Sequence, residues 1–401
     1  MKIAAIIAEY NPFHNGHAYH IEKTKAQTGA DAVVAVMSGS FVQRGEPAAA
    51  DKFLRARAAV LGGCDLVIEL PAAFSLGSAQ RFAFGAVSLV RDMGCVSALS
   101  FGSECGDLGK LNELNGAMRS EEFSARQKEI ADGGVSYPAA RALTAREMLS
   151  AELADMLSQP NNILALEYIN EAGRLCPAIS LVTVPRMGAA HDASETYGEF
   201  ASASVLREER TLGLSRFVPK RCCELYREAI DQGIFYVNTS DFDELVLSHL
   251  IRMSREELAR VPDVSEGLEN KIYDAVRRSQ SLSELYDAVK SKRFTHSRLR
   301  RIVMCAYLGI QKSDLEAPPA YIRVLAQNKT GSRVLREMKQ TASLPIITKT
   351  AHISRYGGAA AAQFELECRA TALYAYALKN KEYRRTLNDY TRSAQIIGAL
   401  E

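Results

Sequence analysis

The sequence lacks several features that define large classes of proteins. No apolar run approaches the roughly 18 residues that a membrane-spanning helix needs. The eight cysteines are scattered and include no Cys-x-x-Cys pair, which argues against a disulfide framework or a zinc ribbon. The apolar stretch near residue 3 ends at Glu9, too early for a typical secretion signal. We therefore expect a cytoplasmic protein that contacts no membrane and keeps its cysteines reduced.

Two common phosphate-binding signatures are also missing. The sequence contains neither GxxxxGK[ST] nor GxGxxG, so neither a P-loop nor a dinucleotide fingerprint is present. Internal repeats and low-complexity segments are absent as well. What remains is a chain of 401 residues, with 47% apolar and 24% charged residues, which is typical of a globular protein with two or three domains.

Charge is divided unevenly along the chain. The net charge is only +2, but residues 289–401 contain 20 Lys and Arg against 8 Asp and Glu. The densest basic stretch lies within residues 290–301, and the excess persists to Arg392. An isolated basic run is usually a solvated helix face, but this persistence favours a surface for the phosphate backbone of a polyanion. The residues that we predict to contact RNA phosphates are Lys290, Lys292, Arg293, Arg298, Arg300 and Arg301.

The first half of the sequence alternates strand-like and helix-like segments. Continuous apolar strands that alternate with helices indicate a doubly wound α/β domain with a parallel sheet, whose ligands bind at the carboxyl ends of the strands. The expected strands are residues 3–8, 32–37, 65–70, 97–101 and 179–184, and the clearest helices are 17–27, 50–61, 79–93 and 359–378. We expect an α/β ligand-binding domain over residues 1–215, a helical connection over 216–288, and a basic, mainly helical domain over 289–401.

The loop after the first strand carries residues suited to bind a phosphate. It contains His14-Asn15-Gly16-His17, where Gly16 lets the backbone approach a ligand and the free N–H groups of the new helix attract anions. Two imidazoles three residues apart share one face of the first turn, so both can donate hydrogen bonds to one phosphate. Such donors stabilise charge on the α-phosphate of a nucleoside triphosphate as pyrophosphate leaves. A zinc site that adds Glu9 and His20 is a weaker alternative.

A second element follows the fifth predicted strand. It reads Ser202-Ala203-Ser204-Val205-Leu206-Arg207, in which a serine can cap a helix and Arg207 lies one turn further on the same side. A plain helix cap would explain either serine alone but would not explain Arg207. The position after the last strand of the sheet is where triphosphate oxygens would lie.

These two elements resemble the H-x-G-H and S-S-T-x-I-R signatures of the nucleotidyltransferase superfamily, which also includes class I aminoacyl-tRNA synthetases; Ala203 departs from the second pattern. Several longer blocks are similar to the bacterial tRNA(Met) cytidine acetate ligase family. The resemblance is dense to about residue 210 and looser beyond it. The blocks that carry it are residues 7–17, 38–47 (SGSFVQRGEP), 65–71 (DLVIELP), 100–104 (SFGSE) and 160–165 (PNNILA).

The resemblance implies a Rossmann-like nucleotidyltransferase domain and a ligase that forms acetyladenylate from acetate and ATP. The acetyl group would then pass to N4 of the wobble cytidine of elongator tRNA(Met), with Mg²⁺ accompanying ATP and without acetyl-CoA or a protein partner. His14, His17 and Arg207 would be catalytic. The residues that would hold ATP are Ile7, Ala8, Glu9, Tyr10, Asn11, Pro12, Phe13, His14, Asn15, Gly16, His17, Ala18, Tyr19, His20, Gly102, Asn162, Arg186, Ser202 and Ser204.

Gly102 and Arg186 follow predicted strands, which agrees with this placement, whereas only the resemblance nominates Asn162. Arg186 could bind either a carboxylate or the α-phosphate, because a guanidinium pairs bidentately with both. His191-Asp192 could deprotonate the cytosine amine, although a structural turn fits this pair equally well.

Two rival functions remain open. One is a nucleotidyltransferase that acts on a small phosphate-containing cosubstrate, but such an enzyme gives no reason for the basic region. The other is a non-catalytic tRNA- or ribosome-binding protein, against which the intact histidines and Arg207 argue. Exchange of pyrophosphate with ATP, with and without acetate, separates these alternatives.

Overall fold

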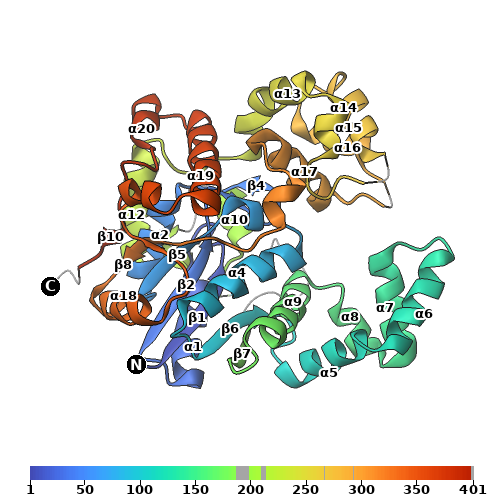
Figure 1. The fold of residues 1–401 in the computed structure, drawn as a ribbon, viewed down its shortest axis with the longest axis horizontal. Coiled ribbons are helices and arrows are strands. Elements are labelled where there is room, and N and C mark those ends of the chain that lie inside the picture. The colour runs from blue at the N-terminus through green and yellow to red at the C-terminus, as the bar shows by residue number, and fades with distance from the viewer. Residues whose placement is uncertain (187–197, 209–213, 266, 292, 399–401) are drawn as a thin grey trace.

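A single mixed sheet forms the centre of the molecule in this computed structural model, which describes residues 1–401 except 187–197, 209–213, 266, 292 and 399–401 (Figure 1). The sheet has eight strands in the order β10-β8-β5-β2-β1-β6-β7, with β9 beside β8. The five strands expected from the apolar runs are all present, and they form the parallel part of the sheet. Their bounds are β1 (Ile3–Ala8), β2 (Ala32–Ser38), β5 (Leu66–Leu70), β6 (Ala98–Ser103) and β7 (Ser180–Pro185).

Both faces of the sheet are buried, as predicted for a doubly wound fold. Along β1, Ile3, Ala5 and Ile7 belong to one apolar cluster, and Ile6 belongs to a second cluster on the other face. This division follows from the alternation of side chains along a strand. The helices that connect or cover the parallel strands are α1 (Asn15–Thr28), α2 (Lys52–Leu61), α3 (Ala72–Ser75), α4 (Ala79–Met93), α9 (Pro160–Leu175), α10 (Ala203–Glu208), α11 (Leu214–Phe217) and α12 (Lys220–Asp231).

Two helical lobes project from the sheet domain on the same side of the molecule (Figure 1). The first is inserted between β6 and α9. The second lies between α12 and β8. The first lobe comprises α5 (Leu108–Met118), α6 (Glu121–Asp132), α7 (Tyr137–Met148) and α8 (Ala151–Met156), and the second comprises α13 (Asp243–Arg252), α14 (Arg255–Ala259), α15 (Leu268–Val276), α16 (Leu282–Val289) and α17 (His296–Leu308).

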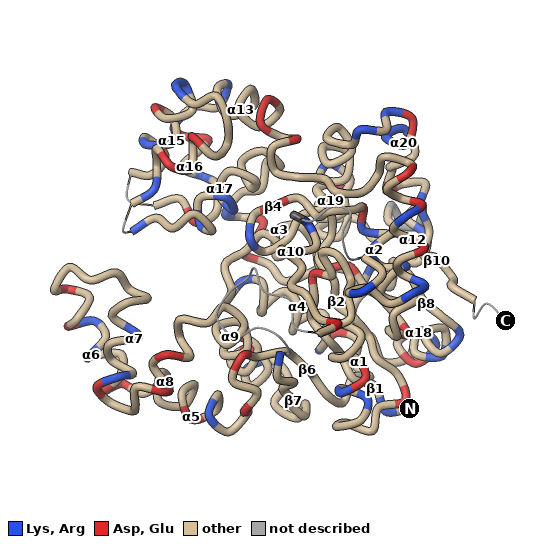
Figure 2. The backbone as a smooth tube through the Cα atoms, turned by 180° about the vertical axis from the view of Figure 1, so that it is seen from behind, with Lys and Arg blue, Asp and Glu red and all other residues tan. Residues whose placement is uncertain are grey.

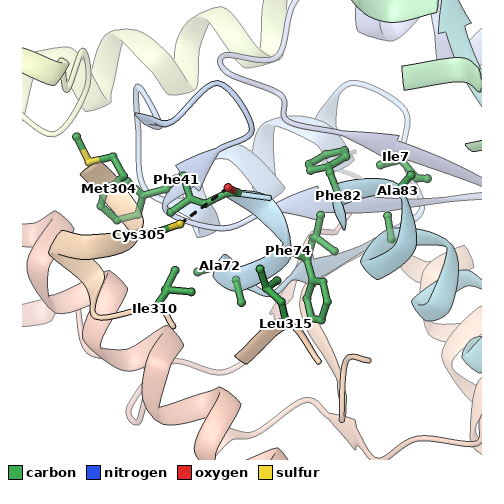
Figure 3. Close-up of a cluster of buried hydrophobic side chains, with 14 of the residues drawn as sticks. Ile7, Phe41, Ala72, Phe74, Phe82, Ala83, Met304, Cys305, Ile310 and Leu315 are labelled. Atoms are coloured by element: carbon green, nitrogen blue, oxygen red, sulfur yellow. Dashed lines mark hydrogen bonds between the residues drawn. The ribbon is translucent and has the colours of Figure 1, made fainter. Parts of the chain in front are cut away.

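Helix α17 fastens the second lobe to the sheet domain. Its Met304 and Cys305 are buried in the same apolar cluster as Phe41, which lies in the hairpin formed by β3 (Phe41–Val42) and β4 (Glu46–Pro47) (Figure 3). The Sγ atom of Cys305 also lies 4.0 Å from the carbonyl oxygen of Leu76. The hairpin is therefore held between the sheet domain and α17.

The boundary predicted at residue 289 is not a boundary of the sheet. Strand β8 pairs antiparallel with β5, although it comes from the region expected to form a separate basic domain. That region is mainly helical, as predicted, but it also completes the sheet domain. Its elements after α17 are β8 (Ile322–Gln327), α18 (Lys329–Thr341), β9 (Ile346–Ile347), α19 (Gly358–Tyr376), α20 (Lys381–Thr386) and β10 (Gln395–Ile396).

A buried group of four charges joins this region to the first half of the chain. Lys52 lies 2.6 Å from Glu69 and 2.8 Å from Asp389. Arg323, the second residue of β8, lies 3.0 Å from each of the same carboxylates. All four side chains are at most 1% exposed, so each charge is compensated only by its neighbours. We call Lys52, Glu69, Arg323 and Asp389 the buried quartet.

Among the described residues, no helix combines the length and the apolar character that crossing a bilayer requires.

Candidate active site

A cavity of about 650 Å³ opens at the carboxyl ends of β1, β6 and β7. This is the edge of the sheet where the doubly wound fold was predicted to bind its ligand. Besides these strand ends and the segments directly after them, its walls include the start of α1, the β3–β4 hairpin, the start of α4, the start of α9, residues 200–204 with Arg207, and the start of α17.

His14 and His17 lie together at the start of α1. Their rings are stacked, with centroids 3.8 Å apart. Nδ1 of His14 accepts a hydrogen bond from the backbone N–H of Gly16 at 3.0 Å, and Nδ1 of His17 accepts one from the backbone N–H of His14 at 3.2 Å. A backbone N–H can only donate, so both Nδ1 atoms carry lone pairs and each neutral ring carries its proton on Nε2.

Both imidazoles are neutral at physiological pH. Burial lowers the pKa of His14 to about 3, and the nearby Arg186 guanidinium adds to this effect. Burial also lowers the pKa of His17 well below its usual value, with further contributions from His14, Arg186 and His20. Each ring therefore offers one Nε2–H as a donor, which is the form needed to stabilise charge on a phosphate.

His20 continues this wall of the cavity. Its Nε2 lies 3.0 Å from Oγ of Ser100, and burial lowers its pKa to about 4. No group of three or more His, Cys, Asp or Glu side chains within the described part of the chain is arranged to hold a metal ion. The zinc alternative, which would have used Glu9 and His20, therefore gains no support from these side chains.

Arg55 fixes the loops that follow β1 and β2. This buried guanidinium donates to the carbonyl oxygens of Glu9 at 2.6 Å, Ser38 at 3.1 Å and Ala50 at 3.0 Å, and also to that of Gly39. Four carbonyl acceptors replace the acidic partner that a buried arginine usually needs. The loop that carries the histidines is thereby tied to the base of the hairpin.

The second predicted element also reaches the cavity. Ser202 caps α10 by accepting from the backbone N–H of Val205 at 3.3 Å, and both Ser202 and Ser204 line the cavity. Arg207 donates to the carbonyl oxygen of Asn11 at 2.8 Å and lies 3.6 Å from the Glu46 carboxylate. The two motifs, almost 200 residues apart in sequence, thus face one space.

Arg186 and Asn162 occupy different layers of the site. Arg186 lines the cavity and donates to Oδ1 of Asn161 at 2.9 Å. Asn162 is fully buried, and its Oδ1 accepts from the backbone N–H groups of Glu104 at 3.0 Å and Cys105 at 3.2 Å. Asn162 thus supports the loop after β6 from behind the wall, and its contact with ATP remains a prediction.

Within the long predicted block, some residues face the cavity and others support it. Phe13 is fully buried and packs beneath the loop, with its backbone N–H bonded to Tyr226. Asn15 donates to the carbonyl oxygens of Glu199 and Arg216. The predicted residues that line the cavity are Ile7, Ala8, Glu9, Tyr10, Asn11, His14, Gly16, His17, Tyr19, His20, Gly102, Arg186, Ser202, Ser204 and Arg207, whereas Pro12, Phe13, Asn15, Ala18 and Asn162 do not.

The sequence reasoning gave no role to the β3–β4 hairpin, which supplies Gln43, Arg44 and Glu46 to the cavity. The signal was available, because this hairpin is part of the SGSFVQRGEP block that carried the resemblance. What the sequence could not show is that the loop after β2 folds back over the end of β1. The backbone N–H of Gln43 donates to Oε1 of Glu9 at 2.8 Å, which holds the hairpin there.

Three of the arginines predicted to bind RNA are already engaged within the protein. Arg298 donates to the carbonyl oxygen of Asp263 at 2.7 Å and to Ser265 at 2.8 Å. Arg301 pairs with the Asp263 carboxylate at 3.3 Å. Arg300 pairs with Glu46 at 2.6 Å, which brings α17 to the cavity mouth. The predicted contacts of these three residues with RNA stay predictions, and an RNA phosphate would share their guanidinium groups with these partners in the fold.

The other predicted RNA contacts remain predictions. Lys290 and Arg293 are exposed, whereas Lys292 lies outside the described residues, as does His191-Asp192. Lys and Arg are spread over α17, α18 and α20, and do not form a single stripe (Figure 2). Some Lys and Arg residues of the region after residue 289 thus pair with groups inside the fold, and others lie on several separate surfaces.

Comparisons with known proteins agree with this site. The family model described as HIGH Nucleotidyl Transferase matches residues 1–389. The tRNA(Met) cytidine acetate ligase of Thermoanaerobacter sp. (strain X514) is 40% identical over 95% of this chain and 96% of its own length. The enzyme of that name from Acetivibrio thermocellus is 35% identical over 99% of this chain and 100% of its own.

Two solved structures are similar to this chain over its whole length. The crystal structure of apo Thermotoga maritima TmcAL matches with a TM-score of 0.94 and 30% identity over the whole of both chains. A second structure of that protein, bound with alpha-thio ATP, matches with a TM-score of 0.92, also at 30% identity over both whole chains. The chain therefore belongs to the HIGH nucleotidyl transferases and, within them, to the tRNA(Met) cytidine acetate ligase family of enzymes.

Proposed function

We propose that this enzyme activates acetate with ATP and transfers the acetyl group to N4 of the wobble cytidine of elongator tRNA(Met). The observation that carries the proposal is the pair of neutral, stacked imidazoles whose Nε2–H groups serve one cavity at the carboxyl end of β1. The relative bound with alpha-thio ATP supports the assignment of ATP to this fold. A tRNA substrate also places the reaction in the cytoplasm.

In the first step, an acetate oxygen attacks the α-phosphate of ATP, and the bond to pyrophosphate breaks. His14 and His17 donate their Nε2–H groups to the α-phosphate oxygens, which gain charge in the transition state. Both donors are neutral and fixed by the backbone, so no proton has to be transferred and little reorganisation is needed. Ser202, Ser204 and Arg207 bind the departing phosphates, at the edge of the cavity formed by α10.

Activation is required because the cytosine amine is a weak nucleophile, its lone pair being delocalised into the ring. In the second step, the amine attacks the carbonyl carbon of acetyladenylate, and AMP leaves. Mg²⁺ would accompany ATP and supply additional positive charge near the phosphates. Its ligands would be phosphate oxygens and water, since the described part of the protein offers no cluster of three acidic, His or Cys ligands.

We propose that the second lobe and the region after residue 289 bind the tRNA. The supporting observation is that Ser297 and Arg301 of α17 line the same cavity as the histidines. An RNA held by α17 would therefore lie against the mouth of the nucleotide site. The exposed residues Lys290 and Arg293 precede this helix and extend the same surface.

Two assays test the proposal. The first measures exchange of labelled pyrophosphate into ATP, with and without acetate and in the absence of tRNA. The second measures N4-acetylcytidine in tRNA after incubation with labelled acetate and ATP. We expect acetate-dependent exchange and labelled acetylcytidine. Exchange that needs a small phosphate cosubstrate, acetylation from acetyl-CoA alone, or no exchange at all would contradict the proposal.

A further inference from the structure

Glu9 lines the cavity within the segment predicted to hold ATP, but the adenylation step proposed above uses no proton acceptor. The residue directly follows β1, and its backbone carbonyl is held by Arg55 at 2.6 Å. One carboxylate oxygen, Oε1, accepts the backbone N–H of Gln43 at 2.8 Å. No described residue donates a hydrogen bond to the other oxygen, Oε2. A carboxylate is thus fixed in the cavity with one oxygen left for a ligand.

The other two carboxylates of the cavity wall are occupied. Glu46 lies between Arg300 at 2.6 Å and Arg207 at 3.6 Å. Glu104 accepts hydrogen bonds from the backbone and side chain of Asn161, and from the backbone N–H of Asn162 at 2.7 Å. Their oxygens hold the fold of the site together and are not available to a substrate.

The two motif histidines cannot serve as proton acceptors. The lone pair on Nδ1 of each ring is used by a backbone N–H, and the remaining nitrogen, Nε2, already carries the ring proton. His20 is engaged with Ser100. Within the described wall of the cavity, Glu9 is therefore the group best placed to accept a proton.

The second step of the proposed function needs such a group. The lone pair of the cytosine N4 atom forms a bond to the acetyl carbon, the bond from that carbon to the phosphate oxygen breaks, and AMP departs with its electron pair. The nitrogen must then lose one of its two protons to become a neutral amide. We infer that Glu9 accepts a hydrogen bond from the N4 amine and takes this proton, which it later releases to water.

The same contact would distinguish cytosine from uracil. The exocyclic amine of cytosine is a donor, and a carboxylate is its natural acceptor in protein–nucleic acid recognition. Uracil presents a carbonyl oxygen at the same position, so a carboxylate would face a second acceptor across the cavity. Glu9 would thus contribute both catalysis and base selection.

Charged groups from five elements surround Glu9. Burial is the main influence and raises the pKa of the carboxyl group, while the Gln43 N–H, Arg44 and Arg207 oppose that rise and Glu46 adds to it. A raised pKa brings the base closer to the working pH, where proton transfer is most efficient. The groups that face Glu9 are Arg44 and Glu46 of the hairpin, Arg207 of α10, Arg55 of α2, Tyr168 of α9 and Arg186 at the end of β7.

The inference rests on the proposed function, and separating the two half-reactions tests it. Glu9→Gln retains an acceptor oxygen for the Gln43 N–H but cannot take a proton. We expect transfer from chemically prepared acetyladenylate to tRNA to be slowed by about 100-fold or more, and acetate-dependent pyrophosphate exchange to fall by a much smaller factor. The single-turnover transfer rate of the wild type should rise with pH to a plateau, and Glu9→Gln should lose this rise. Glu22→Gln, which removes an exposed carboxylate of α1, is the control for both assays.

Transfer at the wild-type rate by Glu9→Gln, or an unchanged rise with pH, would overturn the inference. So would a parallel loss of exchange, since Glu9 would then act on ATP or acetate. A His191→Ala variant that loses transfer while Glu9→Gln retains it would assign the proton to another base and also overturn the inference. An absence of acetate-dependent exchange in the wild type would instead overturn the proposed function, and this inference with it.

Discussion

Glu367 gives the clearest test of the electrostatics of the fold. This fully buried side chain of α19 lies beside the buried quartet and accepts the backbone N–H of Ala72. Burial, followed by the charge of Glu69, raises its pKa from 4.5 to about 8, while Lys52 opposes this rise. Glu367 is therefore protonated in the fold at neutral pH, whereas the unfolded chain ionises it above pH 4.5.

The sign of the effect on stability follows from proton binding. Between pH 4.5 and pH 8 the folded state binds more protons than the unfolded state, so the free energy of unfolding falls as pH rises. Each pKa unit corresponds to about 1.4 kcal/mol, so the interval from pH 5 to pH 8 removes about 4 kcal/mol. Glu367→Gln retains an acceptor for the backbone N–H of Ala72 but cannot ionise. Its free energy of unfolding should therefore not fall by this amount between pH 5 and pH 8.

Thermal unfolding at pH 5 and pH 8 measures the difference. With an unfolding entropy of about 2.1 cal/mol/K per residue, 4 kcal/mol corresponds to about 5 °C for this chain. We expect Glu367→Gln and wild type to have similar Tm values at pH 5, and the variant to unfold about 5 °C higher at pH 8. Glu365→Gln, on the same helix but exposed, should follow wild type at both pH values. If the Tm difference between Glu367→Gln and wild type were the same at both pH values, the raised pKa would be refuted.

Three further predictions concern the site and its supports. His14→Asn keeps a good helix cap but lacks the Nε2–H, so acetate-dependent pyrophosphate exchange should fall by about 100-fold or more while Tm stays unchanged. Near-normal exchange would contradict the role of the imidazole. Gly45→Ala places a methyl group 2.4 Å from the backbone nitrogen of Arg301, at a residue with φ +76°, so Tm should fall and the KM for tRNA should rise. The control is Gly116→Ala, in open space on α5, which should preserve both Tm and KM. Equal behaviour of the two variants would show that α17 does not need the close approach to Gly45. Asn162→Ala leaves the backbone N–H groups of Glu104 and Cys105 unpaired, which should lower the free energy of unfolding in urea by about 1–3 kcal/mol and raise the KM for ATP. Asn162→Asp should recover much of the lost stability and of the KM for ATP. A change in KM with full stability would indicate that Asn162 contacts ATP directly.

Local patterns were sufficient to predict the parallel sheet and the placement of two imidazoles at the edge where its cavity opens. The apolar runs at residues 3–8 and 32–37 clearly indicate buried strands, because a strand that is buried on both faces contains few polar residues. The contact between His14 and His17 could be predicted from their spacing at the junction of the first strand and helix, since a helix start brings residues three apart together. Their tautomers could not be predicted, because these depend on backbone N–H groups that only the folded turn directs at the rings.

Features that depend on distant partners escaped prediction. Strand β8 was not expected, because Arg323 interrupts a short apolar run and is compatible with burial only through Glu69 and Asp389. The partners that Arg298, Arg300 and Arg301 find within the fold could not be predicted, because Asp263 and Glu46 lie 35 to 254 residues away in the sequence. The support that Asn162 gives to the loop after β6 was not predicted, because that loop lies almost 60 residues earlier, and the contact of Asn162 with ATP stays a prediction.

The sequence separation within the buried quartet has a consequence for protein synthesis. Lys52 and Asp389 are 337 residues apart, so a ribosome that adds about 5–20 residues per second needs roughly 17–70 seconds to produce the second after the first. During this interval the emerging nucleotide-binding half has the ion pair between Lys52 and Glu69 but lacks Arg323 and Asp389. We expect the buried quartet, and with it the mature packing of the catalytic half, to form only when translation is nearly finished.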